Sequence, residues 1–190
     1  MNRNAMSPPA PPGRASWLRA VLLRDAVPAD RAFQLALYAA THADEIAQFG
    51  WQAQLQHEFV VQQFEAQGAH FLRHHPDAAC QIMEMRQCPI GRLLTAREAT
   101  TLTLLDISLI PDLQRHGIAS ECLRRELLLA DEAGLKVELQ VAVDSPARQL
   151  FERLGFRALG EPGLRQAMRR LPLHARQRTR APARSPADEV

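Results

Sequence analysis

The chain has 190 residues, of which 46% are hydrophobic and 23% are charged, values typical of one globular domain. Its formal net charge of +2 is too small to indicate a nucleic-acid or membrane partner by itself. The three cysteines have no CxxC or paired spacing and no apolar run reaches ~18 residues, so we expect reduced thiols, a cytoplasmic location and no membrane span.

The two ends of the chain differ in composition from the part between them. Residues 1–15 are rich in proline, and residues 172–190 are rich in arginine and proline without any periodicity. We therefore predict a disordered leader over 1–15, a folded domain over 16–171 and a disordered tail over 172–190. No aromatic residues are interspersed among the tail arginines, which favours a solvated tail and no nucleic-acid partner.

The first half of the folded region predicts helices between strands. In chain order we expect a strand over 17–23, a helix over 31–40, an irregular stretch or short helix over 41–50, a helix over 54–74, and strands over 78–85 and 90–95 joined by a turn at 87–89. The helix over 54–74 has apolar residues near helical spacing, and Pro76 ends it.

The second half is organised around a strand that runs directly into a helix. Residues 99–110 predict a long, largely buried strand that Pro111 ends, and the helix that follows reaches its C-cap at Gly134. The remaining predicted elements are a strand over 136–143, a helix from Pro146 to Leu154 with Ser145 as N-cap, and closing strands over 156–159 and 164–171.

The junction before that helix has the composition of an anion site. A glycine and a small residue at a helix start leave backbone N–H groups without partners and let a ligand approach them closely, here at Gly117 and Ala119. Arg115 and His116 stand beside the positive end of the helix dipole. The pattern predicts a phosphate or pyrophosphate site, and an ordinary strand–turn–helix is the alternative.

Two motifs stand before and after the predicted strand over 136–143. The first has the spacing Q/R-x-x-G-x-G/A, with Gln114, Gly117 and Ala119, and the second has the spacing S/N-x-A-x-x-L-(Y/F)-x-x-x-G-F, with Ser145, Ala147, Leu150, Phe151, Gly155 and Phe156. Together they resemble the signatures of the GNAT superfamily of acyl-CoA N-acyltransferases, in which the first motif is the pyrophosphate loop. The resemblance extends over residues 17–171 in the order of elements, and it is specific in motif over 104–156.

The resemblance implies a mixed α/β (α+β) GNAT fold with a twisted, mostly antiparallel sheet of six to seven strands, splayed between the fourth and fifth strands and flanked by about four helices. It also implies acetyl-CoA as cosubstrate. The pyrophosphate would bind the backbone amides of Arg115, His116, Gly117, Ile118, Ala119 and Ser120. The pantetheine arm would pair with edge groups of Ile107 and Leu109, and the thiol and adenine-proximal side would be lined by Ser145, Arg148 and Phe151.

Acetyl transfer to an amine needs a base for the ammonium proton. Asp106 is a carboxylate in the middle of an apolar strand, where burial disfavours the charged form, so it is our first candidate. Ser108 lies two residues on, on the same face, and could relay the proton. The alternative is that Asp106 pairs with an arginine and is structural. Glu84 and Glu138 are further candidates, although both are typical of solvated strand residues.

The acid that protonates the departing thiolate is not evident in the sequence. Many family members carry a tyrosine where Phe151 stands, and phenylalanine cannot donate a proton. Tyr38 is the only tyrosine in the chain and lies on the first predicted helix, so we do not assume that it substitutes. Thiolate protonation is then left to water or a serine, while a backbone N–H near residues 107–109 could polarise the thioester carbonyl.

These features predict an acetyl-CoA-dependent N-acetyltransferase that moves an acetyl group to a primary amine of a small molecule or peptide by direct attack. The alternative is a GNAT-fold acyl-CoA-binding regulatory module with little or no turnover. We expect no metal, because no further ligands are suitably spaced around His74 and His75. A homodimer is possible, and no sequence feature requires one.

Overall fold

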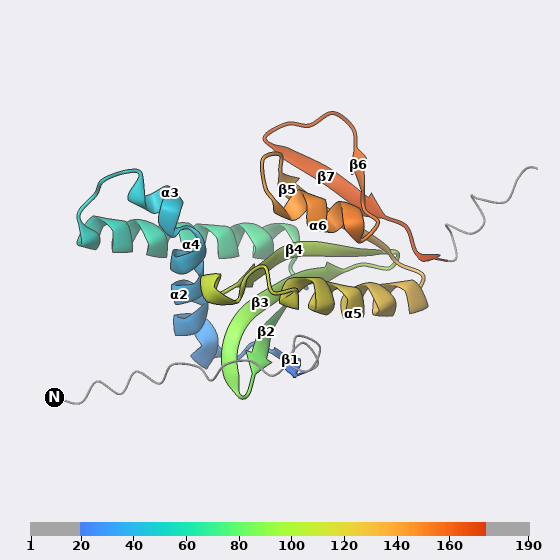
Figure 1. Ribbon diagram of the computed structural model, residues 1–190, viewed down its shortest axis with the longest axis horizontal. Helices are drawn as coiled ribbons and strands as arrows, with labels where there is room; N and C mark the ends of the chain where they lie inside the picture. The colour runs from blue at the N-terminus through green and yellow to red at the C-terminus, as the bar shows by residue number, and fades with distance from the viewer. Residues whose placement is uncertain (1–19, 174–190) are drawn as a thin grey trace, which may run out of the picture.

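The computed structural model describes residues 20–173, which form a mixed α/β structure around one sheet (Figure 1). The predicted leader over 1–15 lies outside the described residues, as does the predicted tail beyond Leu173. The division into a leader, a domain over 16–171 and a tail therefore stays a prediction.

The sheet has seven strands in the order β1-β2-β3-β4-β5-β7-β6. Its strands are β1 (Val21–Asp25), β2 (Ala79–Met85), β3 (Cys88–Arg97), β4 (Thr101–Leu109), β5 (Lys136–Ala142), β6 (Arg157–Leu159) and β7 (Arg165–Arg170). Only the β4–β5 pair is parallel among these strands, and every other neighbouring pair is antiparallel. The seven strands and the mostly antiparallel sheet confirm the fold class expected from the sequence.

The sheet divides between its fourth and fifth strands. Pairing of β4 with β5 runs from Thr101↔Lys136 to Leu104↔Leu139, and both strands continue beyond that point without pairing to each other. In Figure 1, β5, β6 and β7 turn away from β1–β4. A bulge lies at the point of divergence, because Thr95 pairs with Leu104 and Leu94 with Asp106, which leaves Leu105 as the extra residue of β4. Such a bulge bends its strand and increases its twist.

Five α-helices lie among the described residues: α2 (Arg31–Thr41), α3 (Ala43–Ala47), α4 (Ala53–His74), α5 (Ile118–Glu132) and α6 (Ala147–Arg153). Short 3-10 turns, η1 (Pro28–Asp30) and η2 (Pro111–Leu113), precede α2 and α5. Helices α5 and α6 supply apolar side chains to the main core, together with β4, β5 and β7. Helix α2 packs on α4 and on β3 and β4, and α4 reaches β3 through Gln67 and Arg92.

The burial of β4 follows from its alternation. Leu102 and Leu104 are buried in the core that α5 completes, and Ile107 and Leu109 continue this face after the bulge. Thr103, Asp106 and Ser108 consequently face the side of the sheet that α2 and α4 cover. One face of β4 therefore packs in the core, and the alternation of its sequence decides which polar side chains lie on the α2/α4 side.

Three local expectations differ from the structure. The first described strand is Val21–Asp25 rather than 17–23, and Trp17 lies outside the described residues. The β2–β3 turn is formed by Arg86 and Gln87, both with positive φ, so β3 begins before Pro89. Helix α6 begins at Ala147, with Pro146 at its N-cap, although the Ser145 Oγ still accepts the Ala147 N–H at 3.3 Å.

Candidate active site

The loop between β4 and α5 presents backbone donors at one end of the divergence. Gly117 is the N-cap of α5 with φ of 90°, and Arg115 has φ of 60°. The first bond of the helix runs from the Glu121 N–H to the Gly117 carbonyl at 3.0 Å. The N–H groups of the three residues between them, Ile118 to Ser120, therefore have no intrahelical acceptor, and they lie at the positive end of the helix dipole.

Side chains of the same loop fix its position. The Gln114 amide donates to the Leu109 carbonyl at 3.0 Å and so ties the loop to the end of β4. Ile118 anchors the loop from the other side, since its side chain is only 1% exposed and lies in the core. Arg115 and His116 are exposed, and the His116 Nδ1 lies 2.7 Å from the Gln114 carbonyl oxygen. The loop thus offers the exposed Arg115 guanidinium and the His116 imidazole beside backbone donors, an arrangement that fits a diphosphate.

The edge of β4 connects this loop to the middle of the sheet. Beyond Leu104 the edge that faces β5 has no strand partner, and this stretch contains Ile107 and Leu109. Their side chains join the core, so their backbone groups are what the edge can offer a ligand. An edge without a partner can bind an extended chain that carries amides.

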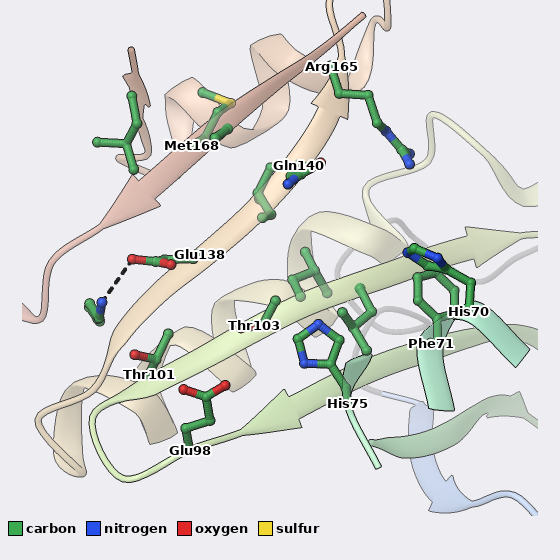
Figure 2. A pocket seen from close by; sticks show the side chains of 16 residues that line it. His70, Phe71, His75, Glu98, Thr101, Thr103, Glu138, Gln140, Arg165 and Met168 are labelled. Atoms are coloured by element: carbon green, nitrogen blue, oxygen red, sulfur yellow. Dashed lines mark hydrogen bonds and ion pairs between the residues drawn. The ribbon is translucent and has the colours of Figure 1, made fainter. Parts of the chain in front are cut away.

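A cavity of about 410 Å³ lies on the α2/α4 side of the sheet, across the divergence. Figure 2 shows it bordered by His70 and Phe71 near the C-terminus of α4, by His75 directly after that helix, and by Thr101 and Thr103 from β4. The other wall comes from β5 and β7, with Glu138, Gln140, Arg165 and Met168. Leu104, Leu105 and Leu139 also line it, so the cavity reaches the bulge and the last paired residues of β4 and β5.

Charges in this cavity are partly paired. The Glu138 Oε1 accepts hydrogen bonds from Lys136 Nζ at 3.0 Å and from Arg169 Nε at 2.7 Å. Burial opposes ionisation of Glu138, but these hydrogen bonds outweigh it and lower the pKa of the carboxyl group. Such a carboxylate is a weak base, so the geometry does not favour Glu138 for proton uptake. Glu84 lies away from the cavity, on β2, where it binds Arg24 at 2.7 Å.

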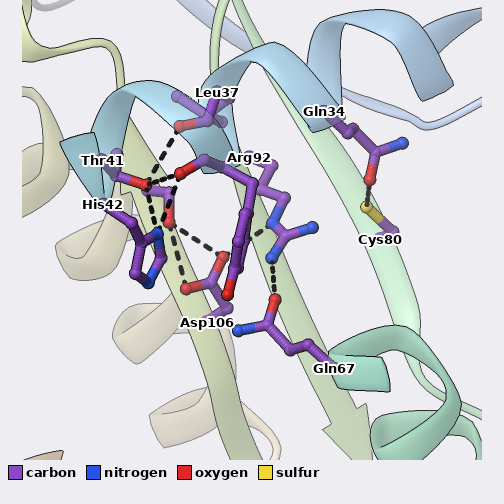
Figure 3. A network of polar contacts seen from close by, with 10 residues as sticks. Gln34, Leu37, Thr41, His42, Gln67, Cys80, Arg92 and Asp106 are labelled. Carbon is purple, nitrogen blue, oxygen red and sulfur yellow. Dashed lines mark hydrogen bonds and ion pairs between the residues drawn. The ribbon is translucent and has the colours of Figure 1, made fainter. Parts of the chain in front are cut away.

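Asp106 lies in a polar network under α2 and α4 (Figure 3). Its Oδ2 accepts Arg92 Nε at 2.7 Å, and the Ser108 hydroxyl lies 3.0 and 3.1 Å from the two carboxylate oxygens. Arg92 is only 7% exposed and donates a second bond, to Gln67 Oε1 at 2.7 Å. Its guanidinium lies 5.8 Å from the centre of the Phe64 ring. The pairing with an arginine, which the sequence left as the alternative, is therefore present, and Ser108 is within reach for proton exchange.

The second motif contributes mostly packing in this structure. Phe151 is 5% exposed and meets Phe156 edge-to-face, with ring centroids 5.7 Å apart. Arg148 lies on the surface of α6 and pairs with Glu152 at 3.1 Å. Ser145 precedes the helix and receives its first N–H. The contacts predicted between these three residues and the cosubstrate stay predictions.

The cavity contains residues that the sequence did not indicate as site residues, among them Thr103, Gln140, Arg165 and Phe71. They come from four separate parts of the chain, and none of them belongs to a motif. Period-two alternation placed Glu138 and Gln140 on one face of β5, which was a partial signal. No sequence feature indicated that α4 and β7 face each other across the divergence.

Within residues 20–173, no cluster of three or more His, Cys, Asp or Glu side chains could hold a metal ion. Over the same range no helix is long and apolar enough to cross a membrane.

Comparisons with known proteins agree with this geometry. A family model described as an acetyltransferase (GNAT) domain matches residues 38–176. A search of curated proteins finds no match. Among solved structures, the PaiA N-acetyltransferase from Thermoplasma acidophilum, in complex with coenzyme A, superposes with a TM-score of 0.62 at 13% identity, covering 80% of this chain and 98% of that one.

Two further structures show the same arrangement of elements. An acetyltransferase from Thermus thermophilus has a TM-score of 0.59 at 22% identity, with 80% of this chain and 97% of that chain covered. The ribosomal-protein-S18-alanine N-acetyltransferase from Escherichia coli has a TM-score of 0.57 at 16% identity, with 80% and 94% covered. At these identities the likeness establishes the fold.

Proposed function

Since the chain belongs to the acetyltransferase (GNAT) domain family and is thus an acyl-CoA-dependent acetyltransferase, we propose that it uses acetyl-CoA and acetylates a primary amine. The observation that carries this proposal is the divergence of β4 and β5 after Leu104 and Leu139. It gives β4 an edge without a partner that ends at a loop of backbone donors, and a cavity on the α2/α4 side meets the same point.

The loop is the proposed diphosphate site. The backbone N–H groups of residues 118–120, with Arg115 and His116 beside them, would bind the two phosphates. Gly117 turns the chain into the helix with φ of 90°, and its lack of a Cβ would let the phosphates approach the backbone closely. The amides of the pantetheine arm would pair with Ile107 and Leu109 along the β4 edge.

The cavity is the proposed acceptor site. Acetyl-CoA would supply the thioester whose acetyl group is transferred, and the bulge at Leu105 would hold a backbone N–H near the carbonyl, where developing charge needs a donor. The amine must lose its proton before it attacks. We assign this proton to Asp106, with Ser108 as the group that relays it, because both face the α2/α4 side of β4 and Asp106 directly follows Leu105, which lines the cavity.

A second function, binding of acyl-CoA without appreciable turnover, is favoured by one specific observation. Phe151 offers no hydroxyl and is buried against Phe156, so it cannot protonate a thiolate. In an active enzyme this proton would come from water or a serine. Measured turnover separates this function from the first, since both require the same acyl-CoA site.

Calorimetric titration of the full chain with acetyl-CoA tests the site, and Gly117→Glu is the variant expected to lose affinity for acetyl-CoA. The variant places a side chain at φ of 90° and a negative charge beside the diphosphate, and we expect its affinity to fall about 100-fold or more. Gly134→Glu is the matched control, because Gly134 also has positive φ, of 67°, but follows the opposite end of α5. Equal loss in both variants, or no binding by the folded wild type, would contradict the proposed site.

A further inference from the structure

A second, smaller recess of about 180 Å³ lies between α2, α3 and α4. Three aromatic side chains line it, from Tyr38 on α2, from Phe49 just after α3, and from Phe59 on α4. Glu45 and Gln63 supply polar groups to its wall. In Figure 1, α3 and the first part of α4 extend past the strands of the sheet. The recess is formed by α2, α3 and α4 and by the turns on either side of α3, which contribute His42 and Phe49.

The aromatic wall is held in place by ring contacts. Phe49 stacks on Trp51 with centroids 4.5 Å apart, and both rings meet Phe59 edge-to-face at 6.0 and 5.2 Å. Tyr38 is held between His42 and Phe64, with centroids 4.1 and 5.9 Å away. Phe49 nevertheless stays 53% exposed. These contacts give a preformed aromatic surface that is open to ligands.

The recess contains one carboxylate, that of Glu45, together with the imidazole of His42. Neither arginine nor lysine lines it. No ion pair of Glu45 occurs with the arginines and lysines of residues 20–173. Burial, with Glu45 nearby, raises the pKa of the Tyr38 phenol, which keeps that wall neutral. Aromatic rings beside a carboxylate are the surroundings that bind an organic ammonium group.

We propose that this recess binds an alkylammonium group of the acceptor, at a distance from the amine that is acetylated. The proposal rests on the proposed function, because the second amine would occupy the cavity beside the divergence. Both sites lie along α4, with Gln63 in the recess and His70 in the cavity, and the helical rise separates these residues by about 10 Å. The acceptor is then a diamine, or a peptide amine followed by a lysine, whose two nitrogens span this distance.

Fluorescence tests binding to the recess independently of catalysis. In a Trp17→Phe background Trp51 is the sole tryptophan, and it stacks on Phe49 in the wall of the recess. Titration with diaminooctane, without acetyl-CoA, should change this emission, and Glu45→Gln and Phe49→Leu should each raise the dissociation constant about tenfold. Asp44→Asn removes the same charge from the neighbouring position of α3, which does not line the recess, and should leave binding unchanged.

Turnover then tests the link to the acceptor. Glu45→Gln should raise KM about tenfold for diaminooctane and leave KM unchanged for octylamine, which has the same chain without the second ammonium. The same comparison is made with a peptide that has a lysine near its amino terminus. The acceptor whose KM rises in Glu45→Gln, diamine or peptide, is the one that carries the ammonium group bound by the recess. If Glu45→Gln raised the KM of neither the diamine nor the peptide while octylamine was still acetylated, the inference would be overturned and the proposed function would stand. Emission changes that Glu45→Gln abolishes, without turnover of any amine, would support the recess and count against the enzyme.

Discussion

At the scale of single residues, Asp106 shows how one side chain can serve two roles. Its carboxylate is the counter-ion of Arg92, whose side chain is almost completely buried. It also holds the Ser108 hydroxyl on the face of β4 that borders the acceptor side. If Asp106 takes up the proton as proposed, the same carboxylate oxygens would serve both stability and catalysis.

We predict that Asp106→Asn lowers kcat about 100-fold and leaves the affinity for acetyl-CoA unchanged, because the variant keeps the side-chain shape and loses the proton acceptor. The unfolding free energy should fall by about 2 kcal/mol, since Arg92 loses its counter-charge. Steady-state kinetics and urea unfolding of the same preparation measure both.

Gln67→Leu is a matched control, since it removes the other hydrogen bond of Arg92 without touching the carboxylate. It should destabilise the protein and retain kcat. If Asp106→Asn lost stability but kept its turnover, Asp106 would be structural and another group would take up the proton.

At the scale of elements, a buried ion pair joins β7 to α5. Arg170 Nη1 and Nη2 bind the two oxygens of Asp131 at 2.7 and 2.6 Å, and both side chains are 7% exposed. Asp131 also accepts the Leu173 N–H at 3.0 Å. The contact holds the outer part of the sheet, beyond the divergence, against the helix whose N-terminus forms the proposed diphosphate site.

Arg170→Met should therefore lower the unfolding free energy by about 3 kcal/mol, because it removes two charge-assisted hydrogen bonds from a buried carboxylate. Arg169→Met is the neighbouring control: Arg169 is 39% exposed and makes a single bond to Glu138, so its loss should cost less than about 1 kcal/mol. Urea denaturation of both variants measures the difference. Similar losses in the two would mean that the buried pair contributes no more than a surface pair.

At the scale of the whole molecule, two carboxylates, one in η1 and one on β5, share one response to acid. Asp30 binds Arg24 of β1 through both oxygens at 2.7 Å, and these hydrogen bonds lower the pKa of Asp30 from 3.8 to about 2. Glu138 of β5 also has a lowered pKa. A carboxyl whose pKa is lower in the folded state stabilises that state above its unfolded pKa and loses this contribution as pH falls.

We expect the free energy of unfolding to decrease as pH falls from about 4.5 towards 2, and Asp30→Asn to flatten this decrease between pH 3.8 and about 2. Urea unfolding across that range, followed by circular dichroism, measures the slope. The same slope in wild type and variant would show that the Arg24–Asp30 contact does not set the acid response.

Much of the chain could be predicted because its signals are local. Residues 54–74, 99–110 and 136–143 carry their periodicity within the segment, and the structure has α4, β4 and β5 there with ends shifted by a few residues. Gly134 was expected as the C-cap of α5, and the structure has it one residue beyond the Ala133 C-cap, with φ of 67°. The turn before β3 was placed wrongly, since Pro89 lies in the strand, next to a turn that Arg86 and Gln87 form without glycine.

The sequence by itself thus determined the order of elements, the family and the loop before α5, because each rests on residues close together in the chain. Only the tertiary structure decided which distant segments come together. The pairing of Asp106 with Arg92, the cavity between α4 and β7, and the aromatic recess of Tyr38, Phe49 and Phe59 join segments far apart in sequence. Periodicity states which side of a strand or helix is apolar, and the partner of that side depends on how the elements pack.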